Sequence, residues 1–175
     1  MKEAILKLPN PYNLIEKMLK KITEELDDET CLIGIPSGGS FIINELKKKI
    51  KGNINYGLID GSFYRDDLEI SGVKVKDKIS SIDFDIDGKK IILIDDIFYT
   101  GRTTRAAINE IFDYGRPKEI KLYVLIDRQH NELPIKPDYV AFKIKQPKNI
   151  SIDLVNNKNE LTFKIRKIND KPSNI

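Results

Sequence analysis

The sequence lacks several features that would place it in a specialised class of protein. Its single cysteine, Cys31, excludes an internal disulfide, and because it lies in an apolar stretch we expect a buried thiol. No apolar run approaches the roughly 20 residues that a membrane-spanning helix needs. The N-terminus has no long apolar segment followed by a small-residue cleavage site, so we expect no signal peptide and a cytoplasmic location.

Internal repeats, low-complexity linkers and a strong charge of one sign are also missing. A chain of 175 residues without a linker is expected to form a single domain over residues 1–175 with a proper core. The 30 basic and 27 acidic residues give a net charge of only +3. Binding to nucleic acid would need lysines and arginines gathered on one face, which a sequence does not display. The composition therefore gives no independent evidence for a nucleic-acid partner.

Residues 91–103 are the most informative part of the sequence. Four aliphatic residues run into Asp95 and Asp96, which predicts a strand that is buried on both faces, as in a parallel sheet. The polar turn that follows, before a helical pattern begins, consists of Thr100, Gly101, Arg102 and Thr103. Hydroxyls and backbone N–H groups of such a turn can surround an anion at the positive end of the next helix. The pattern predicts a site for a phosphorylated sugar; the alternative is a surface loop with an incidental acid pair.

This stretch resembles the motif by which type I phosphoribosyltransferases bind 5-phosphoribosyl 1-diphosphate (PRPP). The resemblance implies that the turn, including Thr104, holds the 5′-phosphate and that the two acids hold the ribose hydroxyls, directly or through Mg²⁺. Successive strand residues point to opposite faces, so both acids can reach one ligand only if the chain turns at Asp96. The alternative is that one acid binds the ligand and the other caps the loop.

A second candidate turn follows the predicted strand at residues 30–35. Pro36 is followed by Ser37, Gly38 and Gly39, and a helix is expected from Ser40. The two glycines allow backbone N–H groups to come close to an anion. In type I phosphoribosyltransferases the loop at this place holds the diphosphate of PRPP; the alternative is an ordinary strand–helix connection.

Strands that alternate with helices predict an α/β fold of the type I phosphoribosyltransferase kind, with a mainly parallel, twisted sheet flanked by helices. The polar stretch 68–89 is expected to form a flexible hairpin lid, and the alternative is a solvated hairpin without a role. The other expected elements are helices at 11–26 and 103–114, strands at 55–64, 119–126 and 139–144, and a C-terminal β-hairpin at 150–155 and 161–165. The inward face of the helix at 103–114 is expected to consist of Ala107, Ile108, Ile111 and Phe112.

A closer resemblance rests on four segments, namely Ser62–Asp67, Asp95–Ala107, Asp113–Pro117 and Val124–Ile135. They resemble, in the same order, the bifunctional pyrimidine-operon regulator and uracil phosphoribosyltransferase (PyrR) family. The resemblance implies that uracil and PRPP give UMP and diphosphate with Mg²⁺. It further implies UMP-dependent binding to pyrimidine-operon leader mRNA in some members, and assembly into dimers or larger homo-oligomers.

The resemblance also assigns the remaining site residues and has two departures. Arg65 and Asp66 are placed at the lid or diphosphate side, and the uracil side is assigned to Tyr99, Asp127 and Arg128. Regulatory members often carry Thr-Arg-Gly where this chain has Ser37-Gly38-Gly39, which removes a bidentate phosphate donor. Gln129 and Asn131 replace a common glycine and arginine, which weakens the RNA prediction more than the enzyme prediction.

Three questions stay open at this stage. Purine-specific relatives have an acid at the position of Tyr99, so the resemblance disfavours a purine substrate. Tyrosine is a poor base at neutral pH, so no general base is assigned. His130 is expected at a loop surface. One rival function is an RNA-binding attenuator that uses the PRPP site only as a nucleotide sensor. A second rival is a phosphoribosyltransferase for another base.

Overall fold

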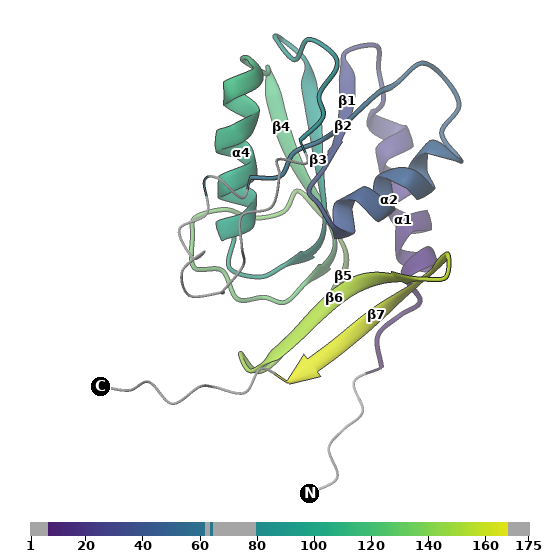
Figure 1. The fold of residues 1–175 in the computed structure, drawn as a ribbon, viewed down its shortest axis with the longest axis vertical. Helices are drawn as coiled ribbons and strands as arrows, with labels where there is room; N and C mark the ends of the chain where they lie inside the picture. The colour runs from purple at the N-terminus through teal and green to yellow at the C-terminus, as the bar shows by residue number, and fades with distance from the viewer. Residues whose placement is uncertain (1–6, 62–63, 65–79, 168–175) are drawn as a thin grey trace, which may run out of the picture.

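Five parallel strands form the central sheet of the chain in the computed structural model (Figure 1). The structure describes residues 7–61, 64 and 80–167. The strands follow the order β2-β1-β3-β4-β5, and each neighbouring pair is parallel. They are β1 (Thr30–Gly34), β2 (Asn55–Leu58), β3 (Lys90–Phe98), β4 (Glu119–Asp127) and β5 (Tyr139–Lys143). The predicted parallel sheet is confirmed.

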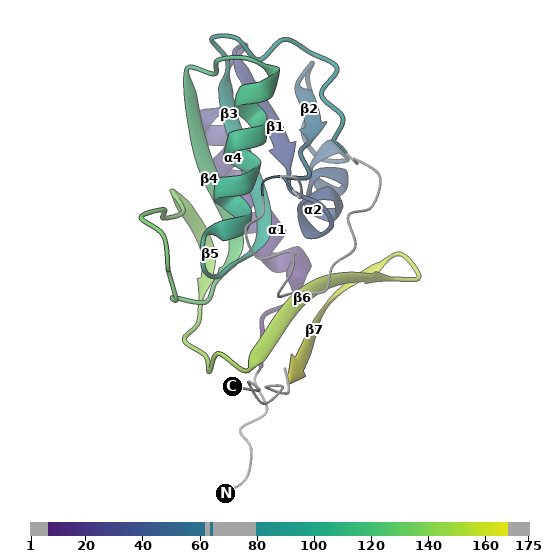
Figure 2. The same ribbon diagram turned by 60° about the vertical axis from the view of Figure 1, so that its left-hand side comes forward.

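Helices cover both faces of this sheet. They are α1 (Pro11–Glu25), α2 (Gly38–Lys47) and α4 (Arg102–Tyr114). Figure 2 shows α4 in front of the sheet and α1 behind it. Ile92 and Ile94 of β3 belong to the core cluster that includes α1 and α2, whereas Leu93 belongs to the cluster that includes α4. The central strand β3 is therefore buried on both faces, as the unbroken aliphatic run predicts.

The inward face of α4 is narrower than expected. Ala107 and Ile111 are buried against the sheet, but Phe112 is 54% exposed. The prediction for Phe112 is wrong, because residues four apart share one helix face while the next position is rotated by about 100°. Because Phe112 is apolar, the prediction included it in the buried stripe and made that stripe too wide.

The C-terminal hairpin is confirmed and forms a separate sheet of two antiparallel strands. It consists of β6 (Ile150–Asn157) and β7 (Glu160–Lys167), joined by Lys158 and Asn159, which both have positive φ. Successive positive φ values give a turn whose twist matches a hairpin. The buried side chains of the hairpin, which join the core cluster of α1 and α2, are Ile152, Leu154 and Leu161.

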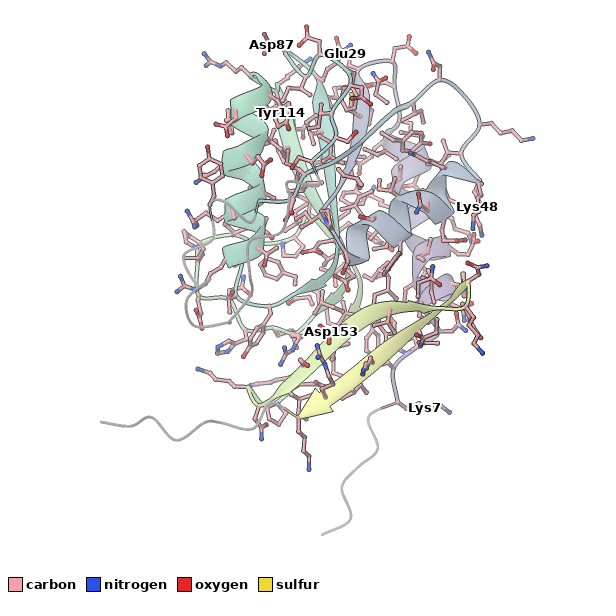
Figure 3. All side chains as sticks on the ribbon, viewed as in Figure 1. Lys7, Glu29, Lys48, Asp87, Tyr114 and Asp153 are labelled. Atoms are coloured by element: carbon pink, nitrogen blue, oxygen red, sulfur yellow. The ribbon has the colours of Figure 1, made fainter. Side chains whose placement is uncertain are left out.

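The hairpin lies across the carboxyl ends of the parallel strands (Figures 1 and 2). Figure 3 marks the two ends of the molecule, with Glu29 and Asp87 at the amino edge of the sheet and Asp153 on the hairpin. Ligands of such sheets bind at the carboxyl edge. The fold therefore brings the predicted turns and the hairpin to the same end.

Residues 68–79 of the predicted lid at residues 68–89 lie outside the described residues. Its described end is fixed to the sheet, since Leu58 and Ser81 exchange two backbone hydrogen bonds of 2.9 Å. The Ser80 hydroxyl donates to Glu110 on α4 at 2.6 Å and accepts the N–H of Asp60 at 2.9 Å. Within the described ranges, no helix is long and apolar enough to cross a membrane.

Candidate active site

The polar turn after β3 borders a cavity at the amino end of α4. Gly101 has φ 90° and ψ −4°, a left-handed conformation that glycine adopts without steric cost. The N–H of Arg102 donates to the Thr100 hydroxyl at 3.3 Å, and α4 begins there. The cavity has a volume of about 320 Å³ and is lined by Asp95, Ile97, Phe98, Tyr99, Thr100, Gly101, Arg102, Thr103, Thr104 and Glu132. The turn therefore has the predicted form, in which the positive end of a helix faces a hollow.

The two acids lie on different sides of β3. The strand continues to Phe98, two residues beyond Asp96, so the chain does not make the turn at Asp96 that would bring both acids to one face of the strand. Pairing of Ile97 with Ile126 on β4 keeps this part of the chain extended. Asp95 is only 7% exposed and lines the cavity, and its carboxylate accepts the N–H of Asp96 at 2.9 Å.

Asp96 instead contacts α2 and the hairpin. Its Oδ2 accepts the N–H of Leu154 at 2.9 Å, and a Cβ added to Gly38 would overlap its carboxylate. Burial raises the pKa of Asp96, and the Leu154 N–H bond acts in the opposite direction. A partly buried carboxylate is stabilised in its charged form by a nearby cation. Asp96 thus connects the α2 turn, the hairpin and the acid pair.

The Ser37-Gly38-Gly39 turn packs closely on the central strand. Helix α2 begins at Gly38, two residues before the predicted start at Ser40, and the Pro36–Ser37 peptide is cis. A Cβ on Gly39 would lie 2.5 Å from the carbonyl oxygen of Ile94. The two glycines therefore allow α2 to lie directly against the central strand. This packing gives a second reason for glycine at these positions, besides the predicted close approach of a ligand.

Two of the three residues assigned to the uracil side come together, Tyr99 from the turn after β3 and Arg128 from the loop after β4. The Arg128 guanidinium carbon lies 3.9 Å from the centroid of the Tyr99 ring, and the His130 ring stacks on Tyr99 with 5.0 Å between centroids. Asp127 accepts the N–H of Gln129 at 2.7 Å. His130 lies in the loop after β4 as expected, and its side chain is 31% exposed, with the ring packed on Tyr99.

Arg128 is bound chiefly by protein groups. It is 5% exposed, and its Nη2 donates to the carbonyls of Pro147, at 3.3 Å, and Ile150 at the start of the hairpin. Burial lowers its pKa. These contacts attach the loop that follows β4, here called the base-side loop, to the start of the hairpin. The contact of Arg128 with uracil stays a prediction.

Sequence reasoning missed Glu132, which also lines the cavity. Its Oε2 accepts a hydrogen bond from Nε of Arg102 at 3.0 Å, and its N–H donates to the Thr100 carbonyl at 3.0 Å. One signal in the sequence could have indicated its position. The loop that contains Glu132 follows β4, the neighbour of β3, so this loop and the turn after β3 leave the same edge of the sheet. The sequence does not indicate which loop residue reaches the turn.

Arg65 and Asp66 lie outside the described residues, as does most of the Ser62–Asp67 segment. Tyr64, which is described, is held by α4. Its hydroxyl donates to Asp113 at 2.5 Å, and its carbonyl accepts Nη2 of Arg105 at 2.5 Å. The lid or diphosphate-side role of Arg65 and Asp66 stays a prediction.

A parallel sheet with two glycine-bearing turns and an acid pair at its carboxyl edge is the architecture of type I phosphoribosyltransferases. A family model described as "Phosphoribosyl transferase domain" matches residues 1–156. A solved hypoxanthine-guanine phosphoribosyltransferase from Bacillus anthracis is 25% identical, with a TM-score of 0.62 over 85% of this chain and 88% of that chain. A hypoxanthine phosphoribosyltransferase from Staphylococcus aureus shares the fold, with 22% identity and a TM-score of 0.62 over 86% of this chain and 81% of that chain.

Curated relatives narrow the class. "Bifunctional protein PyrR" of Pseudomonas paraeruginosa is 37% identical over 152 residues, which cover 85% of this chain and 89% of that protein. The proteins of the same name from Elusimicrobium minutum and Caldicellulosiruptor bescii are 44% and 40% identical, over 73% and 85% of this chain and 74% and 90% of their own lengths. The chain belongs to the PyrR family of phosphoribosyltransferases.

Proposed function

We propose that the chain transfers the phosphoribosyl group of PRPP to uracil, which gives UMP and diphosphate. The observation that carries this proposal is the single cavity shared by Asp95 and the turn at the amino end of α4. The relatives are named bifunctional. We also propose a second function for this chain, UMP-responsive control of pyrimidine genes through leader mRNA.

The two turns bind the two phosphate groups of PRPP. Backbone N–H groups and hydroxyls of residues 100–104, with the Arg102 guanidinium, hold the 5′-phosphate at the positive end of α4. Ser37, Gly38 and Gly39 hold the diphosphate at the start of α2. The turns follow the adjacent strands β1 and β3, and Gly38 lies against Asp96, so one extended ligand reaches both.

Asp95 meets this ligand from the cavity and Asp96 from the α2 turn, so a ligand that spans both turns can contact both acids without a backbone turn between them. The two carboxylates fix the ribose and stabilise the positive charge that develops on it when the bond to diphosphate breaks. Asp95 and Asp96 provide the carboxylate oxygens that Mg²⁺ prefers. Since the described residues contain no group of three or more metal-ligating side chains, oxygens of PRPP must complete the coordination, which is usual for this ion. Bound Mg²⁺ neutralises charge on the diphosphate.

The base binds beside Tyr99. The stack of Arg128, Tyr99 and His130 gives this side of the site a rigid aromatic wall, and backbone groups of residues 126–133 provide the hydrogen bonds that select uracil. Positioning of the two substrates in line is the main contribution of these residues to the rate.

The direct test is incubation with labelled uracil, PRPP and Mg²⁺, followed by detection of UMP, with orotate and hypoxanthine as competitors. PRPP-dependent UMP that only uracil suppresses supports the proposal. Absence of UMP from protein that still binds UMP by calorimetry would instead support a nucleotide sensor, which measurements of leader-RNA affinity across salt concentrations would then examine.

Two substitutions connect this activity to the acids. Asp95→Asn and Asp96→Asn each remove one charge with little change in shape, and each is expected to lower kcat by about 100-fold or more. Asp28→Asn is the matched control, since Asp28 is exposed in the connection between α1 and β1, at the other end of the molecule. Wild-type turnover in either variant would refute the role assigned to that acid.

A further inference from the structure

We propose that Glu132 competes with a sugar phosphate for the Arg102 guanidinium, and that the phosphate binds by displacing the Glu132 carboxylate towards His130. Glu132 is thus a positioning residue that sets the affinity of the turn at residues 100–104, here called the phosphate turn, for a sugar phosphate. The inference rests on the proposed function only in the identity of the ligand, a ribose 5-phosphate group.

The first observation is that the base-side loop is attached to the phosphate turn. Arg102 Nε and Glu132 Oε2 lie 3.0 Å apart. The N–H groups of Glu132 and Leu133 both donate to the Thr100 carbonyl, at 3.0 and 3.3 Å. These three bonds hold the Glu132 carboxylate within the lining of the cavity.

The second observation is an excess of negative charge in a cavity that is built for an anion. Of the ten residues that line it, Asp95 and Glu132 are acidic and Arg102 is the sole base. A phosphate monoester brings between one and two further negative charges near neutral pH. Because a carboxylate and a phosphate compete for the same guanidinium, Glu132 opposes phosphate binding as long as it remains on Arg102.

The third observation is a second donor within reach of the displaced carboxylate. Glu132 Oε1 lies 3.7 Å from Nε2 of His130. This nitrogen is buried, and no described residue forms a hydrogen bond with it. Stacking on Tyr99 holds the ring in place. A small shift of Glu132 from Arg102 to His130 therefore exchanges one protein donor for another, and brings a hydrogen-bond partner to a buried nitrogen that has none among the described residues.

This exchange connects the two ends of the substrate site. Binding of phosphate at the turn places the Glu132 carboxylate on His130, and His130 is stacked on Tyr99 at the uracil side. The bound phosphate thereby adds a hydrogen bond to the aromatic wall against which the base is placed.

The test measures binding of ribose 5-phosphate by calorimetry, without uracil and without turnover. Glu132→Gln removes the competing charge, and the expected dissociation constant is about two- to fivefold lower than that of the wild type, the range of an ion pair at a partly exposed site. His130→Phe retains the stack but removes the donor, and is expected to weaken binding about twofold in the wild type and to have no effect in the Glu132→Gln background. Glu29→Gln, at the opposite edge of the sheet and paired with Lys118 at 3.5 Å, is the matched control and is expected to leave binding unchanged.

Unchanged or weaker binding in Glu132→Gln overturns the inference, because a purely structural attachment of the loop predicts weaker binding. Glu132→Ser carries the same prediction and replaces Glu132→Gln if that variant does not fold. Tighter binding of ribose 5-phosphate by a protein that makes no UMP would support the inference and refute the proposed enzyme. Failure of the wild type to bind ribose 5-phosphate would overturn the inference itself.

Discussion

Gly39→Ala tests how closely α2 approaches the central strand. From helix propensity alone, alanine at the second position of α2 should stabilise the protein by up to about 1 kcal/mol. The structure predicts the opposite. The added Cβ would lie 2.5 Å from the Ile94 carbonyl oxygen and 3.1 Å from the carbonyl carbon of Gly34, and both neighbours are backbone atoms of paired strands.

The magnitude follows from what must move. Because no flexible side chain can yield, α2 has to shift away from β3, and overpacking of this kind costs about 1–3 kcal/mol. After the gain in helix propensity, the net loss in the free energy of unfolding is about 1–2 kcal/mol. For a chain of this size, such a loss lowers Tm by about 2–8 °C.

Thermal unfolding followed by circular dichroism, together with urea unfolding, measures this loss directly. Ser40→Ala is the matched control, since it makes a comparable change at the next position of α2 and adds no atoms. We expect its Tm to remain within about 2 °C of the wild type. A Gly39→Ala protein as stable as this control would refute the close contact of α2 with β3.

Two further predictions concern stability. The Lys121 ammonium, which donates to Glu25 at 2.8 Å, lowers the pKa of Glu25 to about 2. The resulting stabilisation is complete above the ordinary Glu pKa of 4.5 and is lost as the pH falls from 4.5 towards 2. Because the pair is partly solvated, we expect the loss to be about 1 kcal/mol, and Glu25→Gln should flatten this part of the pH profile in urea unfolding. Arg128→Met leaves the carbonyls of Pro147 and Ile150 without their donor, so it should lower the free energy of unfolding by about 2 kcal/mol; an unchanged urea midpoint would contradict this estimate.

Local patterns in the sequence were sufficient for the sheet and for the phosphate turn. The aliphatic run before Asp95 could belong only to a buried strand, and Gly101 marked the place where the backbone needs a left-handed residue. The parallel direction of the strands then follows from the alternation of strands and helices along the chain. These signals depend on residues that are close together in the chain.

Contacts between distant residues could not be predicted in the same way. Arg102 and Glu132 are 30 residues apart, and the Leu154 N–H that binds Asp96 is 58 residues away. Every residue except proline has a backbone N–H, so the residue type at position 154 does not indicate that its N–H binds Asp96. The strand also continued through the two acids, which are rare in strands, because pairing with β4 outweighed their low propensity.

The position of the hairpin has a consequence for protein synthesis. The ribosome produces the five strands of the sheet before it produces β6. Until then, Asp96 lacks the Leu154 amide, and the apolar surface of α1 and α2 that Ile152, Leu154 and Leu161 cover remains open to water. A nascent chain at that stage already contains the turn at residues 100–104, but the surroundings of Asp96 are incomplete. Addition of the hairpin thus completes the core and the surroundings of Asp96 together.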